Sequence, residues 1–262
     1  MVIDFHVHLF PDQLADRAVK ELAERSHLTP EEGGNLERTR KWMRHDGVDI
    51  AVIQNIATNA RQTHNVNRFA VEVDKESDFV AFGSVYPECE WEKELDYLKE
   101  HGIRGIKLHP DYQQFYVDDP KMQPIYEGIL KRGFVLLFHS GLDLGLPDPV
   151  HCTPERAAKT LGLFRGEKVV FAHTGGFEYW DQAEQYLIGE DIYIDTSVTA
   201  GYLEPKRMEE LYKRHNEKKI LFATDYPWGN FAKNIQAINS LAFSNEWKEG
   251  VFHKNAERLL DL

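Results

Sequence analysis

The sequence predicts an α/β protein with the fold of a TIM barrel, a (β/α)8 arrangement of eight parallel strands. Three observations lead to this fold class. The chain has 262 residues, a common length for one α/β barrel. Short apolar runs alternate with charged segments of helical spacing. Polar residues follow at least six of these runs, and a barrel brings the carboxyl ends of all its strands to one mouth. An open, doubly wound sheet is the alternative arrangement.

Eight apolar runs are the predicted strands. They are rich in β-branched residues and nearly free of polar interruptions, which is typical of parallel strands covered on their outer face. They lie at residues 2–8, 48–54, 79–85, 103–108, 134–139, 169–173, 191–196 and 219–224.

The segments between the runs predict helices. Residues 91–102 place Leu95 and Leu98 on one side of such a helix, and similar patterns occupy 124–133 and 205–215. The connection after the first strand is long: we expect a helix at 12–26 and a turn at Gly33–Gly34. The tail at 245–262 predicts one or two helices that close the bottom or the side of the barrel. We therefore expect one domain over residues 1–262.

Composition narrows the class of partner. The formal net charge is −12, from 31 basic and 43 acidic residues, which disfavours nucleic acid or an anionic membrane as the main partner. No apolar run approaches the length of a membrane span. The two cysteines, Cys89 and Cys152, form no disulfide framework, and no cationic leader precedes the first apolar run, so we expect a cytoplasmic protein. A small molecule is the expected substrate.

The first run, MVIDFHVHLF, contains the most informative pair of residues. His6 and His8 are two positions apart in a predicted strand, so both side chains point to the same face. Imidazole is a common ligand of Zn²⁺ and related ions. The pair therefore predicts half of a metal site.

More polar residues stand at the ends of later runs. His109, His139 and His173 end the fourth, fifth and sixth runs, and Asp225 ends the eighth. Such a mixture of imidazole and carboxylate suits a hydrolytic metal site with one position left for water. The ion lowers the pKa of that water from about 15.7 towards about 7. A nearby carboxylate can take the proton, and an imidazole off the metal can orient the water or polarise a carbonyl group.

Residues after the sixth and seventh runs can support this site. Gly175 and Gly176 predict a tight backbone turn beside His173. Asp195 and Ser197 on the seventh run can hydrogen-bond to the metal ligands, although Asp195 can equally cap the following helix.

The motifs DFHVH, GIKLHP, FHSG, AHTGG, TDYPW and NAERLLDL together resemble the amidohydrolase superfamily. The likeness is to its amidohydrolase-related branch (amidohydrolase 2), which includes enzymes similar to aminocarboxymuconate semialdehyde decarboxylase. It covers essentially the whole chain. The resemblance implies a distorted TIM barrel and one divalent metal ion, usually Zn²⁺, with Mn²⁺ or another divalent ion as alternatives. It implies the ligands His6, His8, His139 and Asp225.

The resemblance also implies catalytic roles. His173 would stay off the metal and act on the water or the substrate, and Asp225 would also accept a proton. In binuclear members of the superfamily a lysine on the fourth strand is carboxylated and bridges two metals. Lys107 lies on the fourth predicted strand of this chain, and its carboxylation would let His173 bind a second ion. Because KLHP also occurs in the mononuclear branch, we favour one metal ion.

Several residues are candidates for substrate binding. Lys107 and His109 face the same way and could bind a carboxylate, although Lys107 could instead pair with an acid inside the barrel. Trp228, next to the Asp225 motif, is the best aromatic candidate. The remaining candidates lie in loops after the strands and are individually expected to be packing or rim residues: Asp111, Tyr112, His151, Glu178, Tyr179 and Trp180.

We therefore predict a metal-dependent hydrolase that acts on a small amide, lactone or carboxylated metabolite. The nearest alternative is a metal-dependent, non-oxidative decarboxylase of an unsaturated or aromatic acid. A TatD-type DNase or phosphodiesterase fits less well, because such chains carry a glutamate where this one has GIKLHP and because the net charge is acidic. A catalytically silent metal-binding protein is disfavoured by the complete ligand set. A homodimer is possible, since the aromatic residues near the mouth could serve a dimer contact.

Overall fold

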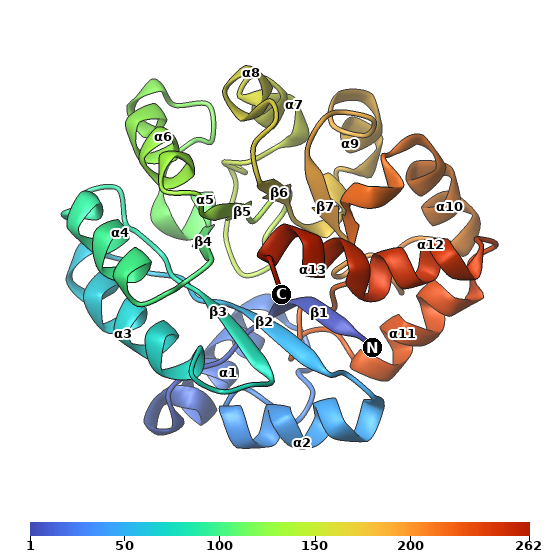
Figure 1. The fold of residues 1–262 in the computed structure, drawn as a ribbon, viewed down its shortest axis with the longest axis horizontal. Helices are drawn as coiled ribbons and strands as arrows, with labels where there is room; N and C mark the ends of the chain where they lie inside the picture. The colour runs from blue at the N-terminus through green and yellow to red at the C-terminus, as the bar shows by residue number, and fades with distance from the viewer.

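Eight parallel strands form the centre of the structure, a computed structural model that describes residues 1–262 (Figure 1). Each strand lies inside one of the eight predicted runs. Their bounds are β1 (Ile3–Val7), β2 (Ile50–Gln54), β3 (Phe79–Phe82), β4 (Gly105–Leu108), β5 (Val135–Phe138), β6 (Val169–Phe171), β7 (Tyr193–Asp195) and β8 (Ile220–Leu221).

The strands pair as two sheets, β1-β2-β3 and β4-β5-β6-β7-β8, which backbone contacts join at both seams. At one seam Gly83 bridges to Ile106 in parallel. At the other, Val7 bridges to Tyr226, and the Phe5 amide donates to the Phe222 carbonyl at 2.8 Å. The strands are short at both seams, so the ladder there consists of isolated bridges. The predicted distorted barrel is confirmed.

Alternation along the strands builds two apolar layers. In β5, Val135 and Leu137 belong to a cluster of 14 buried residues inside the barrel. Leu136 and Phe138, which point the other way, belong to a cluster of 49 between the barrel and its helices. The strands therefore read as continuous apolar runs because both of their faces are covered.

Helices surround the barrel in the order of the chain (Figure 1). They are α1 (Asp12–Ser26), α2 (Leu36–Asp46), α3 (Thr63–Val73), α4 (Trp91–Glu100), α5 (Pro110–Gln113), α6 (Gln123–Lys131), α7 (Pro154–Ala158), α8 (Leu161–Phe164), α9 (Trp180–Tyr186), α10 (Pro205–Arg214), α11 (Phe231–Ser240), α12 (Asn245–Glu249) and α13 (Asn255–Leu260). No helix has the length and apolar character that crossing a bilayer requires.

The extra helices lie where the sequence predicts them. The connection between β1 and β2 contains α1 and α2, with a turn at Gly34, whose φ of 88° favours glycine. The tail forms α12 and α13. Leu259 and Leu260 of α13 join the cluster inside the barrel, so this helix closes one of its ends.

Candidate metal centre

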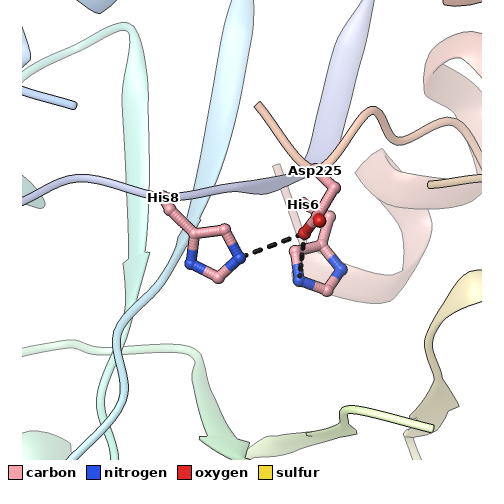
Figure 2. Close-up of side chains that lie close together, drawn as sticks. All are labelled: His6, His8 and Asp225. Carbon is pink, nitrogen blue, oxygen red and sulfur yellow. Dashed lines mark hydrogen bonds and ion pairs between the residues drawn. The ribbon is translucent and has the colours of Figure 1, made fainter. Parts of the chain in front are cut away.

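His6, His8 and Asp225 meet at the end of β1 (Figure 2). His6 lies in β1 and His8 follows it, with ring centroids 5.2 Å apart. Asp225 is held beside them because its amide donates to the His6 carbonyl at 2.8 Å. The Nε2 atoms of His6 and His8 lie 3.3 Å and 3.1 Å from the same atom, Oδ1 of Asp225. Three of the four predicted ligands thus share one point in space.

Hydrogen bonds to the far nitrogen atoms orient both rings. Nδ1 of His8 lies 3.2 Å from the Gln54 carbonyl oxygen, and Nδ1 of His6 lies 2.9 Å from Oδ2 of Asp195. Each acceptor requires a proton on Nδ1 of a neutral ring, which leaves a lone pair on Nε2. Burial first, and then the nearby Lys107 ammonium, lower the pKa of His6 well below its usual value, so His6 is neutral.

This donor set fits a divalent cation. The Nε2 lone pairs of His6 and His8 both face one carboxylate oxygen, and the hydrogen bonds made by their Nδ1 atoms leave no imidazole proton on that side. A metal ion resolves that conflict, and the backing of His6 by Asp195 is the arrangement that usually orients a metal-bound imidazole. Burial alone would raise the pKa of Asp225, but the neighbouring side chains of His8, His6 and His173 lower it to about 2. The carboxylate is therefore ionised and available as a ligand.

His139, the fourth predicted ligand, lies in the same cavity but outside this three-residue cluster. Its Nδ1 atom lies 3.0 Å from Nε2 of His173. Its own Nε2 atom is buried and has no hydrogen-bond partner. A buried polar atom without a partner is costly, so this nitrogen is suited to a ligand. Burial lowers the pKa of His139 well below its usual value, which keeps the ring neutral.

His173, predicted to act beside the metal, lies at a strained turn after β6. Its φ is 61°, that of Thr174 is 55°, and that of Gly175 is 85°, which confirms the predicted tight turn. Asp195 holds the turn by accepting the His173 amide hydrogen at 2.9 Å. The His173 ring stacks on His6 with centroids 5.1 Å apart. Backbone strain of this kind concentrates at functional sites.

Lys107 is completely buried at the end of β4, and its ammonium group donates to Nε2 of His6 at 3.2 Å. Its hydrogen-bond partner is thus an imidazole and not the interior acid considered above. Burial lowers the pKa of Lys107 to about 8, while the carboxylates of Asp195 and Asp225 counteract this. The side chain is therefore a buried cation at neutral pH.

His109 is fixed by a partner that the sequence reasoning missed. The Tyr112 amide donates to Nδ1 of His109 at 3.3 Å, and Nε2 of His109 lies 3.1 Å from Oδ2 of Asp143. The His109 ring stacks on His139 with centroids 4.0 Å apart. Asp143 lies in the loop after β5, and the only available signal was its position four residues after His139.

The site lies at the floor of a cavity of about 490 Å³. The cavity is lined by all of the predicted site residues, namely His6, His8, Lys107, His109, His139, His173, Asp225 and Trp228. Of the loop candidates only Tyr112 lines it. Asp111 and His151 contact each other at 2.9 Å, and Trp180 is buried, so these act as packing residues as expected. Glu178 and Tyr179 do not line the cavity.

Comparison with known proteins gives a family and a fold. A family model described as Amidohydrolase matches residues 3–262. Curated proteins gave no match. Similar solved structures include 5-carboxyvanillate decarboxylase LigW from Sphingomonas paucimobilis, at 15% identity and a TM-score of 0.74, covering 100% of this chain and 99% of that one.

Two further structures are also decarboxylases. 2,6-Dihydroxybenzoate decarboxylase from Rhizobium has 18% identity and a TM-score of 0.71, covering 99% of this chain and 98% of that one. A dihydroxybenzoic acid decarboxylase from Polaromonas sp. JS666, with bound manganese and the inhibitor 2-nitroresorcinol, has 17% identity and a TM-score of 0.73, covering 100% and 97%. The family model spans nearly the whole chain, and the protein therefore belongs to the amidohydrolase family.

Proposed function

We propose that this protein is a metal-dependent, non-oxidative decarboxylase of an unsaturated or aromatic acid. One observation carries the proposal: the completely buried Lys107 ammonium lies 3.2 Å from Nε2 of His6, at the floor of a cavity that is largely apolar. A buried cation beside the metal ligands is a binding partner for a substrate carboxylate. The named activity of the similar solved structures supports the same choice.

The residues divide into three tasks. His6, His8, His139 and Asp225 would hold one divalent ion, which supplies electrostatic binding and polarisation of substrate oxygen atoms. Manganese in the Polaromonas structure supports Mn²⁺ as well as Zn²⁺. Lys107 binds the substrate carboxylate and Trp228 contacts the body of the substrate. His109, predicted to share the carboxylate, has both ring nitrogens engaged by Tyr112 and Asp143 and lines the floor beside Lys107.

In the reaction the bond between the substrate carbon and its carboxyl group breaks. The electron pair stays on the carbon, CO₂ leaves, and a proton takes its place. We assign the delivery of that proton to His173, and the neighbouring Asp225 carboxylate, which is ionised, is the group that can accept a proton. His173 is oriented for this by Ser197, whose Oγ lies 2.7 Å from its Nδ1. The apolar walls keep bulk water away, which protects the carbon centre from competing reactions.

Hydrolysis is the second candidate, with a small amide, lactone or carboxylated metabolite as substrate. It is favoured by the donor set itself, since two imidazoles and a carboxylate suit an ion that activates water. The same cavity serves either reaction, so the products decide between the two.

The experiment supplies the protein with Mn²⁺ or Zn²⁺ and screens two panels, one of aromatic and unsaturated carboxylic acids and one of lactones and amides. Trapped CO₂ in equal amount to the acid consumed supports decarboxylation. A new carboxylic acid without CO₂ contradicts it and identifies a hydrolase. The Asp225→Asn and His173→Asn variants are the controls, and both should lose activity by at least about 100-fold.

A further inference from the structure

The walls of the cavity differ sharply from its floor. The titratable groups at the floor all come from residues at or just after the ends of strands, such as His6, Lys107 and Asp225. Above them, α1, α3 and the loops after β5 and β7 contribute mainly apolar side chains, together with a few neutral polar ones. Apart from Asp143, which His109 engages, no charged residue lines these upper walls.

Helix α1 directs its large apolar side chains to this cavity rather than to the core. Ala15 is its only buried residue, although the helix has 15 residues. Its apolar side chains Leu14 and Leu22 instead line the cavity. A helix normally buries its apolar stripe against the core, so an apolar stripe that faces a cavity indicates an apolar occupant.

The exposed apolar side chains at the rim give a second observation. Six large apolar side chains in the molecule are exposed, and two of them, Met1 and Leu262, are chain termini. Of the other four, Leu14, Leu144 and Tyr202 all line this cavity. Exposed apolar side chains gathered at one opening mark a place where apolar matter binds.

We propose that the substrate is an amphipathic acid, whose carboxylate lies at the floor and whose alkyl or aryl-alkyl body extends to the rim formed by Leu14, Leu144 and Tyr202. The carboxylate end rests on the proposed function. The apolar end rests only on the walls and the rim. A volume of about 490 Å³ is within the usual range for small-molecule sites, about 300–1,000 Å³, and leaves room for such a body beyond the reacting group.

The walls also distinguish this substrate from a compact acid with polar substituents all round. Such substituents would lose their hydration against α1 and find few partners there. An alkyl body gains affinity from the same contacts, because removal of apolar surface from water is favourable.

The test uses benzoate, 4-ethylbenzoate and 4-butylbenzoate as binding probes, titrated calorimetrically into the Mn²⁺-loaded protein. We expect each added methylene to tighten binding by about two- to fourfold, the upper value corresponding to full burial. Leu14→Gln and Leu144→Gln should weaken the binding of 4-butylbenzoate by at least about fivefold and leave the affinity for benzoate unchanged. Leu163→Gln is the matched control, because Leu163 is 39% exposed, against 43% for Leu14 and 40% for Leu144, yet lies outside the cavity.

An equal affinity for all three benzoates would overturn the proposal, as would an equal effect of Leu163→Gln. If the Leu14 and Leu144 variants change the molar mass in light scattering but leave the benzoate series intact, the rim is a contact between copies of this chain and the proposal is wrong. The test of the apolar subsite can be separated from the test of the decarboxylase activity. A graded series without CO₂ release refutes the decarboxylase alone, and CO₂ release with a flat series refutes the apolar subsite alone.

Discussion

The Nε2 atom of His173 lies 3.0 Å from the Nδ1 atom of His139, so the residue predicted to act on the substrate is hydrogen-bonded to a predicted metal ligand. The direction of this bond follows from its surroundings. The Ser197 hydroxyl donates to Oδ1 of Asp195, so its oxygen accepts a hydrogen bond from the protonated Nδ1 of His173. Nε2 of His173 must then accept from His139, and the lone pair of His139 remains on its buried Nε2.

Ser197 therefore sets the tautomer of His173 without contacting the substrate. We expect Ser197→Ala to lower kcat by about 10- to 100-fold, the usual loss when a supporting hydrogen bond is removed, with unchanged metal content. The readouts are kcat and metal by mass spectrometry. In the His173→Asn background the same change should have little further effect. A full additional loss there would show that Ser197 acts independently of His173.

The cluster of His6, His8 and Asp225 predicts metal stoichiometry. We expect about one equivalent of divalent metal in the purified protein, which is lost in His8→Ala and in Asp225→Asn because each removes one ligand of a small set. The His45→Ala variant is the control, since His45 is exposed and pairs with Asp46 on the surface. Metal is measured by plasma mass spectrometry. Two equivalents, with added mass on Lys107, would favour the binuclear site.

Metal removal should also lower stability, because the ion binds the folded site and not the unfolded chain. At a free Mn²⁺ concentration 100 times Kd, the ion adds about 2.7 kcal/mol to the free energy of unfolding. Chelation should remove this increment from the wild type. The Asp225→Asn variant should show no response to chelator in the same urea titration. An equal response in both proteins would place the stabilising ion elsewhere.

Asp4 and Thr224 join β1 to the segment after β8 that carries Asp225. The Thr224 hydroxyl donates to Oδ2 of Asp4 at 2.6 Å, and the Thr224 amide donates to Oδ1 at 3.1 Å. Both residues are completely buried. Thr224→Val leaves a buried carboxyl oxygen without its partner, so we expect a loss of about 1–3 kcal/mol in the free energy of unfolding and weaker Mn²⁺ binding.

Thr224→Ser keeps the hydroxyl and serves as the control for that change. It should retain Mn²⁺ affinity within about threefold, a difference of about 0.7 kcal/mol. Calorimetric Mn²⁺ titration and urea denaturation are the two measurements. A Thr224→Val protein with unaltered Mn²⁺ affinity and free energy of unfolding would show that the contact with Asp4 neither positions the cluster nor stabilises the fold.

Much of the fold could be predicted from sequence because its signals are local. Parallel strands covered on both faces leave continuous apolar runs, and all eight strands fall within such runs. The helix predicted at 12–26 has those bounds in the structure. The convergence of His6, His8 and Asp225 follows from two rules, the two-residue period of a strand and the common mouth of a barrel.

The remaining features depend on loop paths, which carry no period. Asp143 contacts His109 from the loop after β5, and its position four residues after His139 does not by itself predict that contact. Asp111 and His151 were expected to be packing or rim residues, but the sequence did not indicate that they contact each other. The position of His139 beside His173, outside the three-residue cluster, depends on side-chain rotations that spacing along the chain does not fix.

The last prediction concerns pH and a histidine remote from the cavity. His215 donates from Nε2 to the Ile192 carbonyl at 3.0 Å, and its Nδ1 accepts from the Gly189 amide at 3.1 Å. Both contacts require the neutral ring. Burial, only partly offset by the Ile192 contact, lowers the pKa of His215 to about 4.

In the unfolded chain the pKa of this histidine returns to about 6.5. Between pH 6.5 and 4 the unfolded state therefore binds a proton that the folded state does not, and stability falls as pH falls through this window. The contribution is fully present above pH 6.5, and its loss amounts to about 3 kcal/mol at the lower end.

The His215→Gln variant should have a lower free energy of unfolding than the wild type at pH 7, but should lose less of it on acidification. Urea denaturation from pH 7 to 4 in the presence of chelator measures both slopes, with His45→Gln, at an exposed site, expected to follow the wild type. Parallel slopes for His215→Gln and the wild type would mean that protonation of His215 does not oppose folding.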